Sequence, residues 1–86
     1  MISISTGDTV FHKPSRETWL VACVIGNRLM WCGWPEGQGK LSDCLLVTKA
    51  THTERLDLLQ QMANMGGNDE RSRFARDYLT AGGMWP

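Results

Sequence analysis

The stretch Thr18-Trp-Leu-Val-Ala-Cys-Val-Ile25, with Gly26-Asn27 and Arg28-Leu-Met-Trp-Cys-Gly-Trp34 after it, decides the fold. Its first part is rich in β-branched and aromatic side chains, which favour strands. Gly26 and Asn27 both tolerate positive φ, so the pair predicts a tight hairpin turn. The sequence therefore predicts a strand, a turn and a return strand over residues 18–34.

The strand over residues 18–25 is apolar on both faces. Strict alternation would divide it into two sets: Trp19, Val21, Cys23 and Ile25 on one face, and Leu20, Ala22 and Val24 on the other. An antiparallel strand with one face in water alternates polar and apolar residues instead. We therefore expect a small, strongly bent barrel whose outer face is covered by another part of the chain.

Shorter strands are expected on both sides of this hairpin. One covers residues 9–13, after the turn signal Gly7-Asp8 and before the break at 14–17. Two more cover residues 40–41 and 45–48, with 35–39 as a loop containing proline and glycine and 42–44 as a turn. Together they predict an SH3-like β-barrel of about five short strands over residues 7–48.

The rest of the chain has a helical pattern. Thr51 and Glu54 have the spacing of a capping box. Apolar residues then recur at helical intervals, first as Leu56, Leu59, Met62 and Ala63 and later as Phe74, Ala75, Tyr78 and Leu79. Gly66-Gly67 is expected to end the first helix, and Asn68 or Asp69 to begin the second. The prediction is one α+β domain over residues 1–86, with the barrel, a helical hairpin over 51–80 and a tail over 81–86.

Composition restricts the classes of function. The 86 residues carry nine basic and nine acidic side chains, a formal net charge of zero. Non-specific binding of nucleic acid requires an excess of basic residues, which is absent here. The longest apolar run, residues 19–25, is far shorter than the roughly 20 residues that span a membrane. The amino terminus lacks the pattern of a signal peptide, so we expect a cytoplasmic protein whose three cysteines are reduced.

The first half of the chain resembles a known group of proteins. Gly7-Asp8-x-Val10, the apolar strand, Trp31-Cys-Gly-Trp34 and Leu45-Leu-Val47 are similar to the small YodC-like, SH3-type bacterial proteins of unknown function. The sequence also resembles small proteins of phages and other mobile elements in three segments: His12-Lys-Pro-Ser, Glu17-Thr-Trp19 and Trp31-Cys-Gly-Trp-Pro-Glu36. The resemblance covers about residues 7–48. It implies the barrel fold and no catalytic residue.

The sequence also resembles one family of enzymes, the plasmid-borne type II dihydrofolate reductases. Those proteins are short SH3-like barrels with a Gly-Asp-x-Val start and a Val-Gln-Ile-Tyr active-site run. The corresponding segment here, residues 41–47, lacks the glutamine and the tyrosine. We therefore expect no reductase activity.

Catalytic and metal sites find little support in the sequence. Cys44 beside Asp43, with His12 or His52 folded near it, is the one candidate for nucleophilic catalysis. The cysteines and histidines could ligate one zinc ion, but their spacing lacks the close pairs of structural zinc sites. We expect no enzyme, no metal and no cofactor, and keep a small metal-binding or enzymatic barrel as an alternative.

A protein partner or a homodimer fits the pattern better. Trp34, Pro35 and Glu36 place an aromatic ring beside a loop, as in SH3-type folds that bind peptides. Phe74 and Tyr78 would join this set if the second helix is exposed. We therefore predict a small protein-interaction or regulatory module, which acts on a host protein if the resemblance to phage proteins extends to function. The alternative is a nucleic-acid-binding barrel, in which the basic residues of the second helix, Arg71, Arg73 and Arg76, would meet phosphate.

Overall fold

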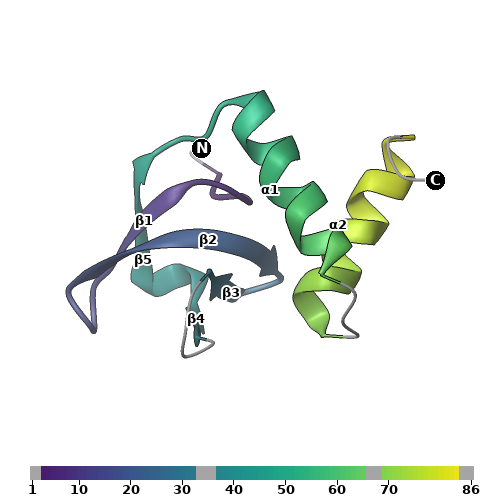
Figure 1. The fold of residues 1–86 in the computed structure, drawn as a ribbon. Helices are drawn as coiled ribbons and strands as arrows, with labels where there is room; N and C mark the ends of the chain where they lie inside the picture. Colours follow the sequence, from purple (N-terminus) through teal and green to yellow (C-terminus); the bar gives the residue numbers. More distant parts are fainter. Residues whose placement is uncertain (1–2, 33–36, 66–68, 84–86) are drawn as a thin grey trace.

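Five strands and two helices follow one another in the predicted order in the computed structural model, which describes residues 3–32, 37–65 and 69–83 (Figure 1). The strands are β1 (Thr9–His12), β2 (Glu17–Ile25), β3 (Arg28–Trp31), β4 (Gly37–Lys40) and β5 (Cys44–Thr48). A 3-10 turn over Leu41–Asp43 precedes β5. The helices are α1 (His52–Asn64) and α2 (Glu70–Ala81).

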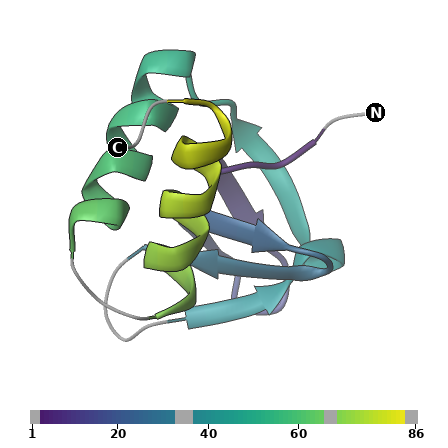
Figure 2. The same cartoon turned by 90° about the vertical axis from the view of Figure 1, so that its right-hand side faces the viewer.

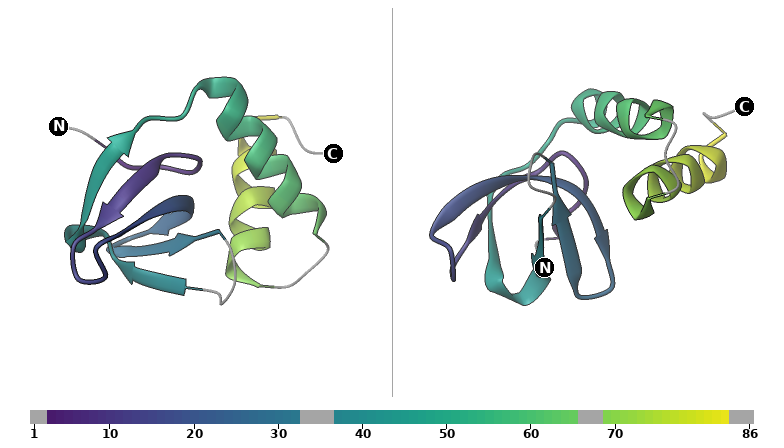
Figure 3. Two further views of the ribbon diagram at one scale, coloured as in Figure 1. Left: turned by 60° about the vertical axis from the view of Figure 1, so that its left-hand side comes forward. Right: turned by 60° about the horizontal axis from the view of Figure 1, so that its bottom comes forward.

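The strands form one antiparallel sheet in the order β4-β3-β2-β1-β5. The sheet is strongly curved, and β4 and β5 are its two edge strands (Figure 3). The α+β architecture that the sequence predicts is confirmed. The sheet is open over the described residues, so its closure into a barrel is not seen.

A β-bulge in β2 changes the predicted faces of this strand. The register with β3 pairs Val21 with Trp31 and Cys23 with Met30, so one residue is extra between these pairs. A bulge of this kind breaks strict alternation and increases the local bend. Val24 consequently packs against the same cluster as Val21, although alternation would place the two on opposite faces.

The curved sheet encloses one apolar cluster and the helices cover a second. Val10, Val21, Leu29 and Cys44 are buried inside the curve of the sheet. Ala22 lies on the opposite face of β2 and is buried against both helices. The helices contribute to this second cluster Leu59, Met62 and Ala63 from α1, and Ala75 and Leu79 from α2. Figures 1 and 2 show α1 and α2 side by side against the same side of the sheet. The expectation that the helical part covers the apolar outer face holds at Ala22 only, because Leu20 is 44% exposed and Val24 packs on the inner cluster.

Strand β4 corrects a second expectation. Residues 37–39 belong to the strand Gly37–Lys40, not to a loop. Gly37 lies opposite Trp31, and a Cβ atom at Gly37 would overlap the indole ring. A Cβ at Gly39 would lie 3.2 Å from His12 Nε2 and 3.5 Å from the Trp19 ring. Aromatic rings thus cover the two glycines, and this packing offsets their poor strand propensity.

The helix starts follow the sequence closely. Thr51 Oγ1 accepts a hydrogen bond from Glu54 N, and Thr51 N donates to Glu54 Oε1 at 2.9 Å, which completes the predicted capping box. Asp69 is the N-cap residue of α2, whereas Asn68 and Gly66-Gly67 lie outside the described residues. The predicted core residues of both helices are buried or packed on the core, with one exception. Tyr78 is 46% exposed, and Ser72 is buried in α2 instead.

Candidate interaction surfaces

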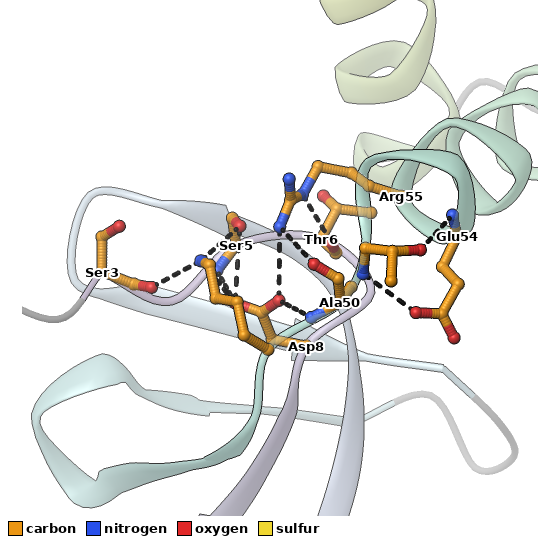
Figure 4. A network of polar contacts seen from close by, with 9 residues as sticks. Ser3, Ser5, Thr6, Asp8, Ala50, Glu54 and Arg55 are labelled. Carbon is orange, nitrogen blue, oxygen red and sulfur yellow. Dashed lines mark hydrogen bonds and ion pairs between the residues drawn. The ribbon is translucent and has the colours of Figure 1, made fainter.

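Asp8 of the Gly7-Asp8 turn is the most highly connected buried polar residue that the structure describes. Its carboxylate is fully buried and accepts hydrogen bonds from Ala50 N at 2.8 Å, Ser5 N at 2.9 Å and Lys49 Nζ at 2.9 Å (Figure 4). Arg55 Nη2 lies 3.4 Å from Oδ1. Burial by itself would raise the pKa of Asp8, but the hydrogen bonds and the Lys49 charge hold it below the ordinary 3.8.

This network gives the Gly-Asp pair a structural role. It ties the residues before β1 to the segment between β5 and α1, because Lys49 also donates to Ser3 O and Arg55 Nε donates to Thr6 O at 3.1 Å. Gly7 has a φ of +89°, and a Cβ there would lie 3.0 Å from the Ala50 side chain. The motif therefore positions the helical hairpin on the sheet.

Three aromatic rings from neighbouring strands form a row on the inner face of the sheet. The ring centroids of Trp19 and Trp31 are 3.3 Å apart, and those of His12 and Trp19 are 3.9 Å apart. All three rings are half-buried. Two of them also form hydrogen bonds through ring nitrogen atoms: Trp19 Nε1 donates to Glu17 Oε2, and His12 Nδ1 lies 2.8 Å from Ser15 Oγ. Because the rings stack on one another and cover the glycines of β4, we assign this row a structural role in packing the inner face of the sheet.

Cys44 is not arranged as a nucleophile. It lies opposite His12 in the β1–β5 register, but its thiol donates to Lys40 O at 3.5 Å. Burial raises the pKa of Cys44, and the nearby Asp43 charge raises it further. The thiolate is the reactive form, so this environment disfavours nucleophilic chemistry. Across the described part of the chain, no three His, Cys, Asp or Glu side chains converge as metal ligands would.

The five residues that the sequence predicts for partner binding do not form one surface among the described residues. Trp34, Pro35 and Glu36 lie outside the described residues. Phe74 is half-buried and packs on the core between the helices and the sheet. Tyr78 is exposed, and its ring centroid is 6.2 Å from that of Phe74. Of the five predicted residues, Tyr78 alone is both described and well exposed.

A surface that the sequence analysis did not select lies on the outer face of β5, β1 and β2. It consists of Phe11, Leu20, Leu45 and Val47, which we call the outer strip. Leu45 and Val47 are 53% and 55% exposed, Leu20 is 44% exposed, and Phe11 is half-buried. Phe11 is paired with Leu45 on one side and with Thr18 on the other, while Leu20 is paired with Thr9. The register therefore places Phe11, Leu20 and Leu45 on one face of three adjacent strands. Val47 lies at an irregularity in the β1–β5 pairing and is exposed two residues after Leu45.

The helices leave much of this face uncovered. Figures 1 and 3 show the helix pair on one side of the molecule and the length of β5 on the other. The opposite face of β5 is already used, because Cys44 is buried in the inner cluster and Leu46 is half-buried. Strand β5 is thus an edge strand with apolar residues on both faces. Natural edge strands usually avoid such exposure.

A groove of about 320 Å³ continues from the outer strip towards α1. Leu20 contributes to both features. The other lining residues are Gly7 before β1 and one side of α1, formed by Glu54, Asp57, Leu58 and Gln61. We call this feature the acidic groove. It combines apolar side chains with two carboxylates, and no basic residue is among the lining residues described.

The sequence contained a signal for the outer strip. Leu45-Leu46-Val47 is an apolar run without alternation, which is typical of a strand covered on both faces, so it exposes apolar side chains wherever one face is left uncovered. Which strands the helices cover depends on the tertiary packing, so the exposure became evident only with the fold.

No protein-family model, no curated protein and no solved structure matches this chain. Among the described residues, neither helix has the length and apolar character required to cross a lipid bilayer.

Proposed function

We propose that this protein is a small protein-interaction module that docks a partner protein through the outer strip. The observation that carries the proposal is the exposure of Leu20 on β2 and of Leu45 and Val47 on β5, with the half-buried Phe11 on β1 between these two strands. Large apolar side chains scattered singly on a surface are ordinary, but a contiguous patch of them marks an interaction site in many soluble proteins. Within the described residues β5 pairs with β1 alone, so its other edge adds backbone groups without a strand partner beside the patch.

The fold suits this role. The strand order β4-β3-β2-β1-β5, the bulged β2 and the 3-10 turn before β5 support an SH3-like arrangement. The helical hairpin is tied to the sheet by the Asp8 network and by the Arg28–Glu70 ion pair at 2.6 Å, and it packs on β2 while leaving the strip open to a partner. The chemistry of Cys44 supports a non-enzymatic role. A host protein as partner is part of the proposal and rests on the sequence resemblance alone.

Site-specific photo-crosslinking in the native host tests the proposal. A photoreactive amino acid replaces Val47 in one variant and Thr80, an exposed residue of α2, in a matched control. We expect the variant with the probe at Val47 to form a covalent complex with one protein that the control does not capture. Equal labelling from the two positions would contradict the proposal.

A further inference from the structure

The residues that line the acidic groove have one sign of charge. On α1 they are Glu54 and Asp57, one turn apart, followed by Gln61 a turn later. The sheet side contributes Gly7 and Leu20. A chain with a formal net charge of zero therefore presents a local excess of negative charge beside its exposed apolar surface.

The basic side chains of Lys49 and Arg55 form their hydrogen bonds and ion pairs outside the groove. Lys49 Nζ is held by Asp8, Ser3 O and Ser5 Oγ, and Arg55 donates to Thr6 O, Ala50 O and Asp8 (Figure 4). Neither side chain lines the groove. Asp57 has no ion-pair partner within residues 3–32, 37–65 and 69–83. Glu54 accepts one backbone hydrogen bond, from Thr51 N, and remains exposed.

We infer that the acidic groove and the outer strip together bind a segment of the partner protein that carries basic side chains beside apolar ones. Apolar side chains of that segment cover Leu20, Leu45 and Val47, and Lys or Arg side chains reach Glu54 and Asp57. The inference rests on the proposed function and specifies the chemistry of the partner. Charge complementarity of this kind favours one class of partner and raises the rate of association.

Selection from a display library of short random peptides tests the inference with no knowledge of the partner. Selected peptides are then measured by fluorescence anisotropy against the wild type and a Glu54→Gln/Asp57→Asn double variant. Glutamine can keep the capping box, so α1 should stay intact. An Asp77→Asn variant, which removes one exposed carboxylate from α2, is the control. A third variant, Leu45→Ser/Val47→Ser, reports whether a peptide uses the outer strip.

We expect the peptides that need the outer strip to be enriched in Lys or Arg together with Leu, Ile, Val or aromatic residues. The Glu54→Gln/Asp57→Asn variant should bind them about fivefold more weakly, as the loss of two exposed ion pairs implies. Added salt should weaken binding to the wild type and have less effect on the double variant. The Asp77→Asn control should bind like the wild type.

Four results would overturn the inference. Strip-dependent peptides without a net positive charge, or peptides bound equally by the wild type and the double variant, would refute the charge argument and leave the proposed function standing. A dimer that Leu45→Ser/Val47→Ser converts to a monomer would make a second copy of the chain the occupant. A selection that yields no strip-dependent peptide would count against the inference and the proposed function together.

Discussion

Replacement of Asp8 by asparagine should destabilise the fold more than any other exchange of a single carboxylate for an amide. The two carboxylate oxygens accept from backbone N atoms of Ser5 and Ala50 and from the side chains of Ser5, Lys49 and Arg55. An asparagine side chain offers one acceptor oxygen, and its amide group would face donors. Breaking a buried ion pair by removal of one partner typically costs about 3–5 kcal/mol.

The expected cost lies near the lower end of that range, because the Lys49 side chain is 45% exposed and can turn into water. A loss of about 3 kcal/mol corresponds to a fall in Tm of roughly 15 °C for a domain of this size. Circular dichroism melts of the wild type, Asp8→Asn and the exposed control Asp77→Asn at neutral pH measure this difference. The control should melt within about 2 °C of the wild type.

The pH dependence of this difference follows from the lowered pKa of Asp8. A carboxyl group whose pKa is lower in the folded state stabilises the fold fully above its unfolded pKa, and the contribution is lost as the pH falls through the folded value. The gap in Tm between wild type and Asp8→Asn should therefore be constant at neutral pH and shrink below pH 3.8. A gap under about 3 °C at neutral pH, or one that persists unchanged in acid, would refute this account of the network.

Three further predictions concern packing, capping and the thiols. Gly37→Val should lower the free energy of unfolding by about 2 kcal/mol and red-shift the tryptophan emission, because the valine side chain displaces the Trp31 ring. The control Gln38→Val, on the other face of β4, should have neither effect. Thr51→Ala removes the N-cap of α1 and should cost about 1 kcal/mol in a urea titration; an unchanged midpoint would be inconsistent with the capping box. Ellman's reagent should react slowly at neutral pH until urea unfolds the protein, because burial raises the pKa of Cys23, Cys32 and Cys44.

Local signals accounted for the parts of the fold that local residues control. The turn at Gly26-Asn27 and the capping box of Thr51 and Glu54 are formed by neighbours in sequence, and both were predicted correctly. The Val21–Cys23 bulge was not, because it depends on how β2 meets β3 and the helices. Strand β4 was also missed, since Gly37 becomes a strand residue only where the Trp31 ring can cover it.

The candidate site was harder to predict than the fold. Tyr78 lies on the apolar side of its helical pattern, yet the hairpin leaves it 46% exposed because Ala75 and Leu79 occupy the contact with α1 and the sheet. Leu45 and Val47 were expected only as strand residues. Their exposure arises because the helices cover the outer face at β2 and not at β5, whose place in the sheet results from pairing with β1 more than thirty residues earlier in the chain. Contacts of that separation have no local signature.

The most direct test of the central claim compares the wild type with the Leu45→Ser/Val47→Ser variant. Both side chains are more than half exposed, so their replacement should change Tm by only a few degrees. The complex that the photoreactive residue captures in the host should co-purify with the wild type and be lost from the variant. A folded variant that retains the partner would show that the outer strip is not the docking surface, and a variant that unfolds would show that these side chains belong to the core.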